Sequence, residues 1–203
     1  MTSAQSGAIA LLASAISYTL SVCAALMPTE MSLATPCEQW DLSALLAHLS
    51  ESMADLEQGI RTGRLGPGPP DAAWVGDGDP LEALRDRAAE LLCTAYGAPG
   101  QFVAVSGLPV PAGVVACTGA IEIAVHGWDV AAARSGGQPV RPIPSALATR
   151  LLGLCPLLAA GREGLFADPV EVPAQASPGD KLVGFLGRDP GTLARGPALV
   201  TDE

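Results

Sequence analysis

The sequence predicts an all-α fold in a single domain spanning residues 1–203. Hydrophobic residues make up 49% of the chain and charged residues 16%, a balance typical of folded globular proteins. Apolar residues recur at intervals of three and four over several long segments, which indicates helices with one buried face. Glycine and proline gather between these segments, where helices end.

The first expected helix lies within residues 1–29, a segment without any charged side chain. A secretory signal would need basic residues ahead of its apolar core, and a membrane span would need a nearly unbroken apolar run of about 20 residues. Serine and threonine interrupt this segment. We therefore expect a core helix, with a cleaved or membrane segment as the alternative. Its apolar face is marked by Ile9, Leu12, Ile16, Leu20, Cys23 and Met27.

A second helix is expected to begin after Asp41, a suitable N-cap, and to end near Gly63. Residues 63–80 hold five glycines and four prolines, the composition of a long exposed loop. Trp74 in this loop is either a lid residue or an aromatic side chain packed against the helices. A third helix follows over residues 81–96.

Residues 101–111 contain two short β-type runs, which predict a small hairpin or an extended crossover. A fourth helix should span about 112–134, and a fifth about 144–160 with a kink at Pro156. A short last helix is expected over 180–186, followed by an irregular tail at about 190–203. The core should include Leu12, Ile16, Leu45, Leu49, Leu91, Val125 and Leu151.

The fourth helix places three polar residues in an otherwise apolar run: Glu122, His126 and Asp129. Their spacing puts the side chains on one helix face, and buried groups of this kind need a partner. The other histidine of the chain, His48, lies on the apolar second helix. His48, Glu122 and His126 match the three protein ligands of a catalytic zinc site with an open fourth position. The alternative is that each histidine is a core residue with its own hydrogen bond.

Charge and cysteine usage narrow the partners and the compartment. Acidic residues outnumber basic ones 21 to 11, for a net charge of -10. Without clustered Lys and Arg, both nucleic acid and an anionic membrane surface are disfavoured as partners. The five cysteines are odd in number and widely spread, which indicates reduced thiols and a cytoplasmic location. Cys37 is the candidate for a reactive thiol.

Three segments, in order along the chain, resemble a known family: ATPCEQWDLSALLAHL over residues 34–49, EIAVHGWD over 122–129, and FLGRDP over 185–190. They are similar to the DinB-like metal-binding four-helix bundles, in the branch related to mycothiol-dependent maleylpyruvate isomerase. The resemblance implies a four-helix bundle that holds a divalent metal, usually zinc, on His48, Glu122 and His126. It also implies attack by a low-molecular-weight thiol, such as mycothiol, on an electrophilic substrate.

This chemistry agrees with the residues, because zinc lowers the pKa of a bound thiol or water. Asp129 is a candidate to orient a ligating histidine; the alternative is an ordinary hydrogen bond on the helix face. The resemblance also implies a further C-terminal domain, which the isomerase carries; we expect this chain, which ends soon after Arg188, to lack it. We expect a zinc-dependent thiol transferase or thiol-dependent isomerase acting on a small molecule, with a homodimer as a candidate assembly. The alternatives are a thiol-independent isomerase, cyclase or lyase, and a non-catalytic metal- or ligand-binding module.

Overall fold

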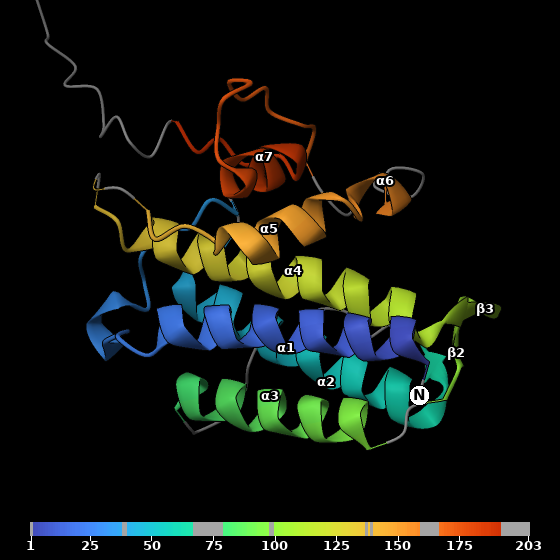
Figure 1. Ribbon diagram of the computed structural model, residues 1–203. Helices are drawn as coiled ribbons and strands as arrows, with labels where there is room; N and C mark the ends of the chain where they lie inside the picture. The colour runs from blue at the N-terminus through green and yellow to red at the C-terminus, as the bar shows by residue number, and fades with distance from the viewer. Residues whose placement is uncertain are drawn as a thin grey trace, which may run out of the picture.

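A computed structural model describes residues 2–37, 40–66, 79–97, 100–136, 138, 140–158 and 167–191. Four long helices lie side by side and form the body of the molecule (Figure 1). The prediction of an all-α, DinB-like four-helix bundle is confirmed, and each of these helices lies where the apolar pattern placed it. They are α1 (Ser3–Cys23), α2 (Leu42–Thr62), α3 (Pro80–Tyr96) and α4 (Ala112–Ala133).

The two ends of α2 follow from its capping residues. Asp41 is the N-cap, and its Oδ1 accepts a hydrogen bond from the backbone N–H of Ala44 at 2.9 Å. Gly63 follows the last turn with a φ of 71°, a left-handed conformation that glycine adopts at little cost. The predicted bounds of this helix are therefore confirmed, and with them the position of the helix that carries His48.

The direction of α2 relative to α4 brings their site residues together. Leu56 of α2 lies against Gly119 of α4, whereas His48, two turns earlier, lies beside Glu122, one turn later. The two helices are therefore antiparallel. The first half of α2 consequently faces the second half of α4, where the polar residues were predicted.

The packing of α1 on α4 is unusually close at Gly127. Thr19 on α1 donates a hydrogen bond from Oγ1 to the carbonyl oxygen of Ile123 at 2.7 Å. A Cβ at position 127 would lie 3.1 Å from the Cα of Thr19 and would overlap its hydroxyl. Glycine between the site residues His126 and Trp128 is thus required by helix packing.

The expected core is confirmed, since the seven residues named above are each at most 1% exposed. Two helices, α1 and α4, are also long and apolar enough to cross a membrane by length and composition. A buried core helix passes the same test. Here 56% of the most apolar window of α1 and 78% of that of α4 are buried inside the fold, in agreement with the interpretation as core helices.

A small sheet caps one end of the bundle in the order β1-β2-β3. Strands β2 (Phe102–Val105) and β3 (Leu108–Pro111) form the antiparallel hairpin that the sequence predicted. The turn between them has positive φ at Ser106 (49°) and Gly107 (80°), which matches the twist of a tight hairpin. Strand β1 (Arg64–Leu65) pairs in parallel with β2. It was not predicted, because two residues are too few to show an alternating pattern.

The expected fifth helix is interrupted. Helix α5 (Ser145–Leu152) ends at Gly153, and α6 (Cys155–Leu158) begins two residues later. The prediction of one helix kinked at Pro156 was wrong, because the chain breaks at Gly153 and Pro156 lies in the first turn of α6, where its missing N–H costs nothing. Helix α7 (Pro178–Phe185) packs on α5, and α5 in turn covers α4 (Figure 1).

Some expectations lie outside the described residues. They include Trp74, most of the loop 63–80 and the tail from residue 192 onward. A short 3₁₀ helix, η1 (Pro28–Glu30), connects α1 to the segment that leads into α2. This segment folds back on itself before α2 begins, which matters for the site.

Candidate metal centre

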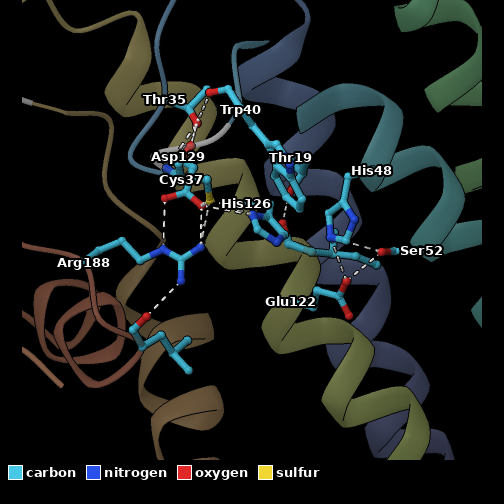
Figure 2. A network of polar contacts seen from close by, with 12 residues as sticks. Thr19, Thr35, Cys37, Trp40, His48, Ser52, Glu122, His126, Asp129 and Arg188 are labelled. Atoms are coloured by element: carbon cyan, nitrogen blue, oxygen red, sulfur yellow. Dashed lines mark hydrogen bonds and ion pairs between the residues drawn. The ribbon is translucent and has the colours of Figure 1, made fainter. Parts of the chain in front are cut away.

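The polar site lies at the end of the bundle away from the hairpin. Helix α4 begins directly after β3, and the site residues occupy its second half. The segment before α2 closes this end: Ala34 forms an isolated bridge with Asp41, and the N–H of Leu42 donates to the carbonyl oxygen of Leu33 at 3.0 Å. The resulting turn brings Cys37 and Trp40 against the polar residues of α2 and α4 (Figure 2).

His48 and Glu122 meet across the interface between α2 and α4. The Nε2 atom of His48 lies 3.3 Å from Oε1 of Glu122. Ser52, one turn after His48, donates a hydrogen bond to the same Oε1 at 2.6 Å, and its Oγ lies 3.4 Å from His48 Nε2. The side chains of His48 and Glu122 are about one-third exposed (32% and 33%), so this side of the site is in contact with solvent.

The second imidazole, that of His126, completes the cluster from one turn further along α4. Its ring centroid lies 5.0 Å from that of His48, and the two rings are nearly perpendicular. Trp40 covers both, with centroid distances of 4.5 Å to His48 and 6.0 Å to His126. The indole therefore supplies an apolar wall beside both imidazoles, and Figure 2 shows the three rings grouped together.

Asp129 determines which nitrogen of His126 is available. Its Oδ2 lies 3.0 Å from His126 Nδ1, and the aspartate side chain is fully buried. A carboxylate in this position assigns the proton of the neutral imidazole to Nδ1. Nε2 of His126 is then the nitrogen left for a ligand, and the hydrogen bond that an orienting role of Asp129 would require is present.

The geometry of His48, Glu122 and His126 suits a metal ion. One ligand atom from each lies within 4.8 Å of the others. Ligands of a tetrahedral zinc ion sit about 2.0–2.2 Å from the metal and therefore roughly 3.4 Å from one another. The 3.3 Å between His48 and Glu122 already has this value. The ligand atom of His126 lies within 4.8 Å of the other two.

The charge state of Glu122 also fits a ligand. Burial raises the pKa of its carboxyl group, but hydrogen bonds from His48 and Ser52, and the nearby His126, lower it by more. The pKa therefore lies below its usual value, and the carboxylate is ionised at neutral pH. An anionic oxygen between two imidazoles is a ligand set that zinc binds readily.

Arg188, from the turn after α7, forms a two-point ion pair with Asp129. Its Nε donates to Oδ1 at 3.2 Å and its Nη2 donates to Oδ2 at 2.8 Å. Burial raises the pKa of Asp129, but hydrogen bonds from His126 and Arg188 and the charge of Arg188 outweigh burial, so the pKa lies below its usual value. The carboxylate thus stays ionised while it holds His126.

Cys37 adjoins this ion pair. Its thiol donates to Asp129 Oδ2 at 3.4 Å and accepts from Arg188 Nη2 at 3.3 Å, and its sulfur lies 3.9 Å from His126 Nδ1. Burial and the charge of Asp129 raise the pKa of the thiol to about 12. The raised pKa argues against the expectation that Cys37 is reactive, since the thiolate is the nucleophilic form.

Sequence reasoning placed four of the clustered residues in the site and named Cys37 only as a reactive thiol. It did not assign Ser52, Trp40 or Arg188 to the site. Ser52 had a local signal, because it follows His48 by one helical turn on the same face. Arg188 had an indirect one: a buried aspartate needs a cation, and only 11 basic residues were available. Trp40, like Arg188, lies in a segment that carries the family resemblance, and it had no other signal.

The fold and the cluster define a class of protein: a helical bundle with two imidazoles and a carboxylate from facing helices at one end. Comparison with known families gives the particular one. Residues 12–131 match the model of the mycothiol maleylpyruvate isomerase N-terminal domain. The chain belongs to this family, and the matched range includes His48, Glu122, His126 and Asp129. Arg188 lies beyond it.

Two curated relatives come from Mycobacterium tuberculosis, one from strain CDC 1551 / Oshkosh and one from strain ATCC 25618 / H37Rv, and both are described as uncharacterized proteins. Each is 31% identical to this chain over 160 residues, which cover 76% of this chain and 82% of the relative. No solved structure matches the chain. The relatives therefore support the family and assign no reaction.

Proposed function

We propose that this chain is a zinc-dependent thiol transferase or thiol-dependent isomerase acting on a small electrophilic metabolite. His48, Glu122 and His126 would hold the metal. The observation that carries the proposal is that one donor atom from each of the three lies within 4.8 Å of the others, with two of the side chains part-exposed. The family supports a role for mycothiol as the thiol.

The residues around the cluster divide the work of such a site. Zinc, when bound, would lower the pKa of a coordinated thiol and make it nucleophilic at neutral pH. Asp129 orients the ring of His126 through Nδ1. Ser52 donates to Glu122 and fixes the carboxylate toward His48. Trp40 stacks beside His48 and shields it from bulk water on one side.

The thiol is assigned to a free cosubstrate because the cysteine of the site is already engaged. Cys37 donates to Asp129 and accepts from Arg188, so its sulfur points into the buried ion pair. The exposed side of the cluster is formed instead by His48 and Glu122. An external thiol and its electrophilic partner would therefore approach from that side.

The charges near the site favour a substrate without several negative charges. Arg188 is paired with Asp129, and Arg134, at the end of α4, is paired with Glu30 at 3.0 Å. These two guanidinium groups are thus already neutralised by carboxylates. A dianionic substrate such as maleylpyruvate would need a cation from elsewhere.

The decisive experiment combines metal analysis with ligand binding. We expect purified protein to carry one equivalent of zinc, and mycothiol to raise its melting temperature only when zinc is present. S-methyl mycothiol is the matched control, since it keeps the sugars and lacks the thiol. If no thiol raises the melting temperature of zinc-loaded protein, the thiol-independent isomerase, cyclase or lyase becomes the favoured function. Protein that takes up no zinc would overturn the metal site.

The proposal also covers the location of the protein, its partners and its oligomeric state. The family and the dispersed free cysteines are consistent with a cytoplasmic protein that acts on small molecules, and the acidic net charge disfavours nucleic acid. A homodimer remains a candidate assembly. Light scattering coupled to size-exclusion chromatography measures the mass directly, and the mass of a monomer would exclude the homodimer.

A further inference from the structure

Two sets of metal-competent side chains share His126. The first is His48, Glu122 and His126, and the second is Cys37, His126 and Asp129; in each, the ligand atoms lie within 4.8 Å of one another. The first set uses the exposed side of the cluster and the second lies deeper, on the Nδ1 side of His126. Because the single imidazole of His126 could serve either set, another feature of the site must determine which set binds the metal.

By ligand chemistry alone, the second set would be a strong competitor. Thiolate is a soft ligand that zinc binds well, and Cys, His and carboxylate together form a familiar zinc donor set. A coordinating thiol loses its proton to solvent when the metal binds. The acid–base state of free Cys37 therefore does not by itself protect this position from zinc.

The positively charged guanidinium of Arg188 lies against two members of the second set, Cys37 and Asp129. The guanidinium donates to both oxygens of Asp129, at 3.2 and 2.8 Å, and its Nη2 also donates to the sulfur of Cys37 at 3.3 Å. Figure 2 shows the planar group facing these two residues. A dication bound to Cys37 and Asp129 would have to displace the guanidinium or tolerate it at close range, where charges of one sign repel strongly.

The backbone around Arg188 holds this group in place. Gly187 has a φ of 85°, and a Cβ there would lie 2.8 Å from the carbonyl oxygen of Ala167, so the turn accepts only glycine. The N–H of Arg188 donates to the carbonyl oxygen of Val183 at 2.9 Å, and Nη1 donates to that of Leu186 at 2.8 Å. The guanidinium is thus oriented before any metal arrives.

We propose that Arg188 is a specificity-determining residue that excludes metal from the Cys37–His126–Asp129 set and so directs it to His48, Glu122 and His126. Because Arg188 pairs with Asp129, no metal ion binds this carboxylate, and Asp129 continues to orient His126. Metal in the second set would be buried, would use His126 through Nδ1, and would lack the exposed side from which a thiol can approach. This inference rests on the proposed function, because it concerns the same metal centre.

The test is X-ray absorption spectroscopy on zinc-loaded Arg188→Gln, which removes the charge and keeps a hydrogen-bond donor for Asp129. Zinc–sulfur distances of about 2.3 Å are resolved from zinc–nitrogen distances of about 2.0–2.1 Å. We expect wild-type zinc to have nitrogen and oxygen neighbours only, and Arg188→Gln to gain one sulfur. The sulfur should vanish in Arg188→Gln with Cys37→Ser. Arg188→Lys is the matched control and, because it keeps the charge, should show no sulfur.

Each outcome decides the matter. Sulfur bound to zinc in the wild type, removed by Cys37→Ser, would overturn the proposal, and so would a folded Arg188→Gln protein whose zinc lacks sulfur. If Arg188→Gln fails to fold, Arg188→Leu, which removes the charge without adding a sulfur atom, is measured in its place, and the wild-type spectrum still stands as a test. Zinc-free wild type would instead refute the proposed function. A gain of sulfur-bound zinc in Arg188→Gln would then still support exclusion by Arg188.

Discussion

Asp129 and Arg188, 59 residues apart in the sequence, form a buried two-point ion pair directly behind His126. The pair links α4, the helix that carries two of the proposed ligands, to the turn after α7. Because Asp129 also accepts from His126 Nδ1, the charge of Arg188 acts on the imidazole through the carboxylate. The C-terminal part of the chain thus contributes to the site although the matched family range ends at residue 131.

Replacing His126 with alanine should abolish zinc binding while the bundle stays folded. His126 is proposed to bind the metal directly, and loss of a residue that only hydrogen-bonds to a metal ligand already costs roughly ten- to a hundredfold in metal affinity or activity. Stability should fall by about 0.5–3 kcal/mol, as for other buried truncations. Metal content and thermal melting measure the two effects. Val125→Ala, the preceding buried residue, is the control and should lose stability but keep zinc. A full equivalent of zinc in His126→Ala would refute the assignment.

Replacing Asp129 with asparagine should weaken zinc binding roughly ten- to a hundredfold, because the amide cannot hold His126 and Arg188 in the same way. It should also destabilise the fold by about 3–5 kcal/mol, since Arg188 is only 10% exposed and would lose its buried counter-charge. Zinc titration and denaturant unfolding measure these separately. In a double-mutant cycle with Arg188→Gln the two changes should be strongly coupled. Additive effects would show that the ion pair has no energetic role.

The stability of the metal-free protein should fall in acid. The pKa values of Asp129 and Glu122 lie below their usual values of 3.8 and 4.5 in the fold, so the folded state binds protons less readily than the unfolded chain. Their contribution is then complete above about pH 5 and is lost as the pH falls through 4 and below. Unfolding with a chelator present, followed across this range, measures it. Asp129→Asn should show a shallower decline, and an equally steep one would exclude this carboxylate as a cause.

Replacing Gly127 with alanine should destabilise the bundle by about 1–3 kcal/mol, because the new methyl group would overlap Thr19 on α1. Since His126 is the adjacent residue, we also expect weaker zinc binding. Gly7→Ala on α1 is the matched control. Nothing lies within 4 Å of a Cβ at that position, so the higher helix propensity of alanine should leave stability unchanged or slightly raised. Equal melting temperatures for the two variants would contradict the close packing.

The long helices could be predicted from the sequence because their causes are local. Periodic apolar residues, the N-cap Asp41 and the left-handed Gly63 act over a few residues and define α2 without reference to the rest of the chain. The cluster of His48, Glu122 and His126 was also accessible, because helical spacing joins two members and the chain has only one other histidine. The break at Gly153 could not be predicted, since the apolar pattern of residues 144–160 fits a kinked helix and two separate helices equally well.

The remainder of the site depends on contacts between distant segments. Sequence alone determined that Asp129 shares a helix face with His126, because a spacing of three residues has that consequence in any helix. Only the tertiary structure decided that its counter-ion is Arg188 and that Cys37 lies against both. No local rule relates these residues. They meet because α7 packs on α5 and the segment before α2 folds back on itself, so that the cost of burying Asp129 is offset by a charge from 59 residues away.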